Sequence, residues 1–217
     1  MNLPAGRTAV KVCGIIREDD ALAAIDAGAD VLGFNTWTGT KRYLDLETNA
    51  AWIERLPIIR VALLVNATLD FAARIAALPF IDALQLHGDE DAVECAQIAA
   101  FSKPIIKALR ADSPAVSSGA DAFSTRHVLL DAHVPGAYGG TGARVDLALA
   151  RTFREANPAL TVWLAGGLRP DNVAEAVRVV RPAVVDVSSG VESEPARKDV
   201  AKMRAFVDAA RSADCTS

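Results

Sequence analysis

Aromatic residues are scarce in this sequence, and cysteines are few. Phe, Trp and Tyr make up 6% of the 217 residues, which disfavours a surface that stacks nucleic-acid bases. Cys13, Cys95 and Cys215 lie far apart and form no CxxC pair, so neither a disulfide framework nor a zinc-ligand spacing is present. No apolar run approaches the roughly 18 residues of a membrane span, and Met1–Gly6 lacks a long apolar signal core. We therefore expect a cytoplasmic protein.

An excess of positive charge is also missing. The net charge is -4, which argues against a general binder of nucleic acid or of a membrane surface. A local positive site for a phosphorylated metabolite stays possible. The composition, 51% apolar with 23% charged residues, is ample for one sizeable core and typical of a globular chain.

Short runs rich in Val, Ile and Leu alternate with amphipathic stretches. The runs predict strands at Ala9–Cys13, Val31–Phe34, Arg60–Val65, Ala83–Leu86, Ile105–Lys107, Val128–Asp131, Val162–Ala165 and Val184–Val187. The stretches predict helices at Asp19–Ala27, Leu46–Arg55, Leu69–Leu78, Glu90–Ala99, Pro114–Ala120, Leu147–Ala156, Asn172–Val180 and Asp199–Ala210. Such alternation, at a period of roughly 25 residues, is typical of repeated βα units with a parallel sheet.

A doubly wound open sheet and an eightfold barrel both fit this alternation. Equal units without a long insertion favour a (β/α)8 TIM barrel. No linker composition, low-complexity tract or charge block marks a boundary, so we expect residues 1–217 to form a single domain with short flexible termini.

Polar residues cluster at the carboxyl ends of several predicted strands, which is where barrel enzymes hold their catalytic groups. Side-chain alternation puts Lys11 and Cys13 on one face of the first strand, and Gln85 and His87 on one face of the fourth. Two strands separate the first from the sixth around the ring, so Cys13 and Asp131 can face each other across the barrel mouth.

Cys13 is the sharpest candidate for a catalytic residue. A free thiol packs as a small hydrophobic group, and taken alone Cys13 fits a buried structural role better than a catalytic one. A thiol has a pKa of about 8.5, so a proton-accepting role near neutral pH requires positive or hydrogen-bonding surroundings. Lys11 is one source of such surroundings, and Gly14 leaves room for a ligand near the backbone.

Two aspartates end apolar strands. Asp131 follows Val128–Leu130, and a carboxyl group there is either a cap and loop acceptor or a catalytic acid, which partial burial would suit to donate a proton. Asp186 alternates with Val185 and Val187 and is expected to point inward near a sugar. Its alternative role is a salt bridge inside the barrel.

Glycine-rich loops follow the last three predicted strands, at Tyr138–Gly142, Ala165–Pro170 and Val187–Glu192. Glycines let backbone amides converge on an anion, and in barrels the loops after strands seven and eight often bind phosphate. Turns need glycine anyway, which is the alternative explanation. Two side chains complete the candidates: Arg42, which can form a fork to a carboxylate or lie in solvent, and His87 at a strand end.

Nine segments appear together in a recognisable order from about Ala9 to Val207. They are Lys11–Ile15, Gly28–Asp30 with Gly33–Phe34, Lys41–Tyr43, Val65–Asn66, Gln85–Gly88, Leu130–Asp131, Gly139–Gly142, Ala165–Leu168 and Asp186–Glu192. In this combination the chain resembles the phosphoribosylanthranilate isomerases of tryptophan biosynthesis. The strings Lys-Val-Cys-Gly-Ile and Asp-Val-Ser-Ser-Gly-Val-Glu are specific only together.

The resemblance implies an eightfold barrel that carries out a cofactor-independent Amadori rearrangement. It implies a small-molecule phosphosugar substrate, no metal, no nucleic acid and no membrane partner. The oligomeric state stays open, with a monomer slightly favoured. The implied roles are a general base at Cys13, a general acid at Asp131, an anthranilate-carboxylate contact at Arg42, a pocket-lining His87, and phosphate contacts at Gly140, Gly166, Gly167, Ser188 and Ser189.

The chain departs from the family pattern in two places. After Phe34 the family commonly has an aromatic residue, then proline and serine, before the arginine, whereas this chain has Asn35, Thr36 and Trp37 there. Ile16 also stands where Thr or Ser is usual. Three alternatives remain: an indole-glycerol-phosphate synthase-like barrel with Lys107 as its catalytic lysine, a metal-dependent pentose-phosphate epimerase-like barrel, and a catalytically silent phosphosugar sensor.

Overall fold

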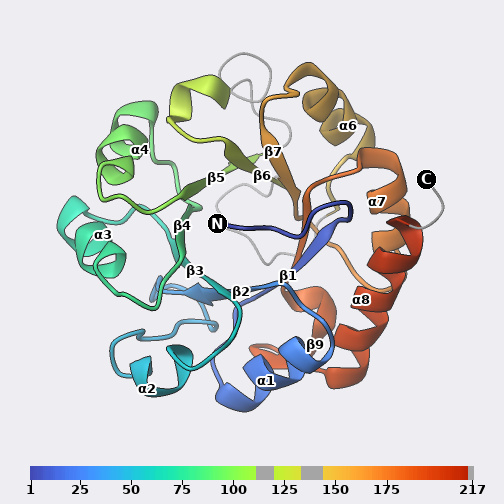
Figure 1. The fold of residues 1–217 in the computed structure, drawn as a ribbon, viewed down its shortest axis with the longest axis horizontal. Helices are drawn as coiled ribbons and strands as arrows, with labels where there is room; N and C mark the ends of the chain where they lie inside the picture. Colours follow the sequence, from blue (N-terminus) through green and yellow to red (C-terminus); the bar gives the residue numbers. More distant parts are fainter. Residues whose placement is uncertain (111–119, 133–143, 215–217) are drawn as a thin grey trace.

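Eight parallel strands close into a barrel in sequence order, which confirms the predicted fold class. The structure, a computed structural model, describes residues 1–110, 120–132 and 144–214. The strands are β1 Ala9–Cys13, β2 Val31–Asn35, β3 Ile59–Leu64, β4 Ala83–Leu86, β5 Ile105–Arg110, β6 His127–Asp131, β7 Thr161–Leu164 and β8 Val184–Val187. Figure 1 shows this ring with its helices outside and the amino terminus over its centre.

Helices form the outer layer of the described chain. They are α1 Glu18–Asp26, α2 Ala50–Ile53, α3 Leu69–Ala76, α4 Ala92–Ala99, α6 Leu147–Ala156, α7 Val173–Val180 and α8 Val200–Asp214. The fifth predicted helix, Pro114–Ala120, falls almost entirely outside the described residues, and a 3₁₀ turn spans Ala120–Phe123. No described helix combines the length and apolarity needed to cross a membrane.

The predicted helix over Leu46–Arg55 is wrong in its extent, because α2 covers Ala50–Ile53 alone. Side chains in the preceding segment bond to the backbone instead. Asp45 Oδ1 accepts a hydrogen bond from the Thr48 amide, and Asn49 Nδ2 donates to the Asp45 carbonyl. Such local side-chain hydrogen bonds compete with the backbone hydrogen bonds of an α-helix, so the segment forms turns.

Side-chain caps fix where two other helices begin. Asp91 accepts from the amides of Val93 and Glu94, while the Glu94 carboxylate accepts from the Asp91 amide, which is a complete capping box for α4. Asp146 accepts from the amides of Ala148 and Leu149 at the start of α6. These caps lie in the segments after β4 and β6, so they fix where the chain turns from the barrel mouth into α4 and α6.

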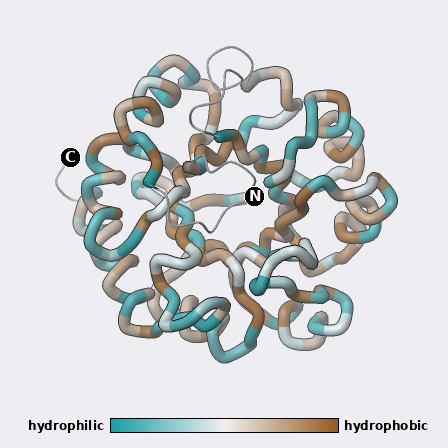
Figure 2. The backbone as a smooth tube through the Cα atoms, turned by 180° about the vertical axis from the view of Figure 1, so that it is seen from behind, coloured by the Kyte–Doolittle hydropathy of each residue, from teal (hydrophilic) through white to brown (hydrophobic). Residues whose placement is uncertain are grey.

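The barrel wall separates two apolar regions. The larger lies between the strands and the helices, and the smaller fills the barrel interior with side chains such as Val31, Leu129 and Trp163. In Figure 2 the central strands are mostly brown, and the surrounding helices alternate between brown and teal. Met1 and Leu3 pack against the interior cluster, so the amino-terminal segment covers that end of the barrel.

A small antiparallel ribbon, absent from the sequence prediction, follows the last barrel strand. It pairs β9, Glu192–Glu194, with β10, Arg197–Lys198, after a 3₁₀ turn at Ser189–Val191. Each strand is too short to give an alternating pattern, which explains why the sequence did not reveal it. The ribbon brings Glu192 and Lys198 beside the carboxyl ends of β1 and β8.

The fully buried Leu129 in the barrel interior provides a test of this packing. We expect Leu129→Ala to lower the free energy of unfolding by about 3 kcal/mol, because the substitution leaves a cavity that the closed barrel cannot collapse. Leu22→Ala is the matched control, since Leu22 is 47% exposed and should change stability little. Urea unfolding followed by circular dichroism measures both, and equal midpoints for the two variants would contradict the assignment of Leu129 to the core.

Candidate active site

Cys13 ends β1 on the face that points into the barrel. The residue is 7% exposed and packs with Leu63 and Val65, with Trp37 next to them. The neighbouring strand leaves room for it at Gly33, where an added Cβ would lie 2.7 Å from Cys13 Sγ. The predicted shared face of Lys11 and Cys13 is confirmed, because both side chains lie against Gly33, where an added Cβ would come within 2.7 Å of Cys13 Sγ and 3.1 Å of Lys11 Nζ.

Burial and charge act in opposite directions on the Cys13 thiol. Burial is the largest influence and raises the pKa of Cys13 above its ordinary value, because a thiolate is poorly solvated there. The Lys11 ammonium lowers this pKa, while the Asp186 carboxylate raises it again. The positive surroundings that a thiolate requires are therefore present, but burial and Asp186 outweigh them, and the pKa of Cys13 is raised.

Lys11 and Asp186 form a buried ion pair inside the barrel. Lys11 Nζ lies 2.6 Å from Asp186 Oδ2, and their side chains are 0% and 6% exposed. Burial is the largest influence and alone would lower the pKa of Lys11, but the negative charges of Asp186 and Cys13 together outweigh it, so the pKa is raised. The salt bridge considered for Asp186 is present, one layer below the mouth, and the contact of Asp186 with a sugar stays a prediction.

Asp131 ends β6 and meets His87 across the barrel interior. His87 Nε2 lies 3.1 Å from Asp131 Oδ2, and Gln85 Nε2 lies 2.7 Å from His87 Nδ1. With Gln85 Nε2 as the donor, Nδ1 is the acceptor and the neutral imidazole carries its hydrogen on Nε2, which donates to Asp131. The Ala132 amide donates to the other carboxylate oxygen at 2.8 Å. Asp131 is thus held by two donors at the mouth.

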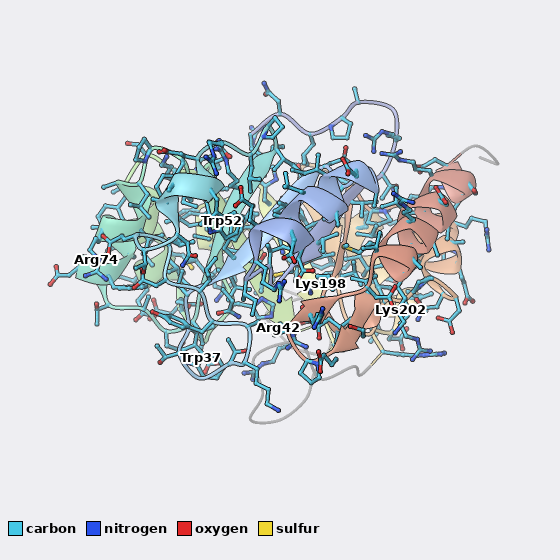
Figure 3. All side chains as sticks on the ribbon, turned by 90° about the horizontal axis from the view of Figure 1, so that it is seen from below. Trp37, Arg42, Trp52, Arg74, Lys198 and Lys202 are labelled. Carbon is cyan, nitrogen blue, oxygen red and sulfur yellow. The ribbon has the colours of Figure 1, made fainter. Side chains whose placement is uncertain are left out.

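Arg42 reaches the mouth from the loop after β2 and pairs with a carboxylate. Its Nε and Nη2 donate to Glu192 Oε1 and Oε2, both at 2.8 Å. This bond is the largest influence on Arg42 and raises its pKa, and the same contacts help to lower the pKa of Glu192 despite burial. Figure 3 shows Arg42 beside Lys198, where the blue start and the red end of the chain meet.

The predicted phosphate loops lie next to these side chains. Gly166 and Gly167 follow β7 with φ of 91° and 62°, a left-handed conformation that favours glycine. Ser188 follows β8, and its Oγ would lie 3.0 Å from a Cβ at Gly14. Ser189 begins the next 3₁₀ turn. Gly140, with the rest of Gly139–Gly142, lies outside the described residues, as do His133 and Cys215.

Three residues to which the sequence assigned no role of their own take part in the site. Gln85 sets the His87 hydrogen bond, and Glu192 and Lys198 surround Arg42. Gln85 is fully buried, so a polar residue inside an apolar strand was the available signal.

Lys107 points away from the interior and pairs with Glu90 at 2.6 Å. The described residues contain no cluster of three or more His, Cys, Asp or Glu that could hold a metal ion.

The fold and this site define an eightfold α/β barrel with ionisable side chains at the carboxyl ends of its strands. A family model described as N-(5'-phosphoribosyl)anthranilate isomerase matches residues 10–209. The isomerase of that name from Thiobacillus denitrificans is 45% identical over 208 residues, covering 93% of this chain and 97% of its own. The chain therefore belongs to the N-(5'-phosphoribosyl)anthranilate isomerase family.

Solved structures agree with this assignment. The phosphoribosylanthranilate isomerase from Thermotoga maritima superposes with a TM-score of 0.84 at 33% identity, covering 94% of this chain and 99% of that one. A second isomerase structure, in complex with reduced 1-(o-carboxyphenylamino)-1-deoxyribulose 5-phosphate, gives a TM-score of 0.80 at 31% identity, covering 94% and 99%. The resemblance inferred from short motifs is confirmed over nearly the whole chain.

The charges around Cys13 predict opposite effects for two substitutions. Asp186→Asn should lower the pKa of the thiol, because Lys11 is then left with Cys13 as its nearest anion. Lys11→Met should raise it, because the cation that stabilises the thiolate is lost. The pH dependence of alkylation by iodoacetamide, in a background where Cys95 and Cys215 are serine, measures both. Shifts in the same direction would contradict the arrangement.

The Gln85 contact predicts the tautomer of His87. In ¹⁵N-labelled protein, His87 should carry its hydrogen on Nε2, and Gln85→Met should allow a population with hydrogen on Nδ1, because the donor to Nδ1 is gone. His87→Gln assigns the resonances, and His127 is an internal control, since it lies against Trp163 at the other end of β6. A hydrogen on Nδ1 in the unsubstituted protein would contradict the donor role of Gln85.

Proposed function

We propose that this chain converts N-(5-phosphoribosyl)anthranilate to 1-(2-carboxyphenylamino)-1-deoxyribulose 5-phosphate, a step of tryptophan biosynthesis. Membership of the isomerase family supports the proposal, as does the bound reduced product in a related structure. The observation that carries it is the placement of Cys13 and Asp131 on separate strands at one barrel mouth, each in its own environment.

Asp131 acts as the general acid and Cys13 as the general base. Asp131 protonates the ring oxygen while the anthranilate nitrogen donates its lone pair to C1, so the furanose opens to an imine. The Cys13 thiolate then removes the proton from C2, and the electron pair moves to the nitrogen, which gives an enolamine. Tautomerisation of the enolamine yields the ketone. The substrate's own nitrogen accepts the electrons, so the proposal includes no cofactor.

The remaining mouth residues bind the two charged ends of the substrate. Arg42 contacts the anthranilate carboxylate with the part of its guanidinium that Glu192 leaves free. Backbone amides near Gly140, Gly166, Gly167, Ser188 and Ser189 bind the phosphate. Fixing both ends holds C2 near Cys13 and the ring oxygen near Asp131, which lowers the entropic cost of reaction.

The position of Lys107 bears on the main alternative. An indole-glycerol-phosphate synthase-like reaction needs a catalytic lysine that faces the substrate. Lys107 Nζ instead donates to Glu90 and to the Gly88 carbonyl, with the Phe123 ring beneath it, between the barrel wall and the helices. This position favours the isomerase over that alternative.

Removal of either acid–base group should stop turnover without preventing binding. We expect Cys13→Ala and Asp131→Asn each to lower kcat by roughly 10²–10⁴-fold, because each removes one proton-transfer step. Binding of the reduced product should survive. Cys95→Ala is the control, since Cys95 lies on the buried face of α4 and its pKa is raised to about 11. Turnover at the unsubstituted rate in either variant would reject that residue's role.

The reaction itself is tested by direct assay. Purified protein should consume phosphoribosylanthranilate, followed as loss of substrate fluorescence, and the rate should rise with pH because burial raises the pKa of the Cys13 base. The gene should also restore growth without tryptophan to a strain that lacks the isomerase. Folded protein that fails both tests would favour the silent phosphosugar sensor.

A further inference from the structure

The bond between Arg42 and Glu192 leaves one edge of the guanidinium free. Glu192 takes the Nε hydrogen and one Nη2 hydrogen, which are two of the five donors of an arginine. Among the described residues none accepts a hydrogen bond from Nη1. The outer edge, formed by Nη1 and the second Nη2 hydrogen, therefore retains the parallel geometry that suits a second carboxylate.

The side chain of Arg42 is confined as well as paired. It is 17% exposed and lies against Gly14, where an added Cβ would come within 2.5 Å of Arg42 Cδ. Gly14 directly follows Cys13, so the guanidinium is held next to the chain segment that carries the proposed base. Its position is thus defined from two sides, by the Gly14 backbone and by the Glu192 carboxylate.

Lys198 restores the positive charge that Glu192 would cancel. Its Nζ lies 2.9 Å from Glu192 Oε1, 2.7 Å from the Cys13 carbonyl and 3.2 Å from the Ser188 carbonyl. Three acceptors match the three hydrogens of an ammonium group. Arg42, Glu192 and Lys198 together therefore carry one net positive charge, and their pairing fixes the direction in which Arg42 presents it.

We propose that Glu192 is a positioning residue, which fixes the orientation of the Arg42 guanidinium while Lys198 neutralises the charge of Glu192. The outer edge of Arg42 then selects substrates with a carboxylate ortho to the nitrogen. This inference rests on the proposed function, because it assigns the specificity of the same site. It assigns a part in carboxylate recognition to Glu192 and Lys198, two residues of the ribbon after β8 that act through the position of Arg42.

A role of Glu192 in reducing local charge and a role in positioning Arg42 predict opposite effects of Glu192→Gln on carboxylate binding. If Glu192 only reduced the local charge, its removal would strengthen the attraction for a carboxylate. If it positions Arg42, the amide group breaks the two-point bond, because its NH₂ faces an arginine donor, and carboxylate binding weakens despite the added positive charge. The sign of the change separates the two explanations.

The experiment compares two stable ligands by isothermal titration calorimetry. One is reduced 1-(o-carboxyphenylamino)-1-deoxyribulose 5-phosphate, and the other is the same compound without its carboxylate. We expect the unsubstituted protein to prefer the first, and Glu192→Gln to lower that preference about tenfold, the contribution of one oriented charge-assisted contact. Affinity for the second ligand should stay the same, which shows that the variant is folded. Glu194→Gln, on the exposed part of the ribbon, is the matched control.

Three outcomes decide the proposal. An unchanged or increased preference in Glu192→Gln, in a protein that isomerises the substrate, overturns the positioning role and leaves the proposed function intact. The double variant Glu192→Gln/Lys198→Met has the original net charge, so recovery of the preference there would also overturn it, whereas a continued loss supports it. If the unsubstituted protein neither isomerises the substrate nor prefers the carboxylated ligand, the proposed function and this inference both fail.

Discussion

The ion pair between Lys11 and Asp186 joins the first strand of the barrel to the last, and the chemistry above it depends on that pair. The two residues are register neighbours on β1 and β8, where the ring closes. A buried pair gains little net stability, but the loss of one partner leaves an uncompensated charge that typically costs about 3–5 kcal/mol. The pair also places a cation and an anion beside Cys13, so the residues that join the two strands act, together with burial, on the pKa of the thiol.

At three places in the barrel mouth, a buried side chain holds a functional side chain in position. Lys11 and Asp186 surround Cys13, Gln85 orients His87 towards Asp131, and Glu192 orients Arg42. Each orienting residue is buried, whereas the residue it acts on is closer to the opening. Because these side chains are already oriented in the folded barrel, little reorganisation is needed when a substrate binds.

The repeating units were predictable because each strand and helix has a local pattern. β1, β4, β8 and α6 begin and end where the sequence predicted, since apolar runs and flanking turn residues mark those elements clearly. The α2 helix was predicted too long, because side-chain bonds of Asp45 and Asn49 to the backbone compete with a helix in ways that hydrophobic periodicity does not show. The ribbon of β9 and β10 was missed because strands of two or three residues have no period.

The sequence by itself determined the βα repeat, the placement of Cys13, His87 and Asp131 at strand ends, and, through its motifs, the family. These properties are local, since side-chain alternation along one strand assigns each residue to a face. Only the tertiary structure decided the partners: Asp186 pairs with Lys11 across 175 positions of sequence, and Arg42 with Glu192 across 150. Such pairs form because closing the barrel brings distant strand ends together, and no pattern within a single strand contains that information.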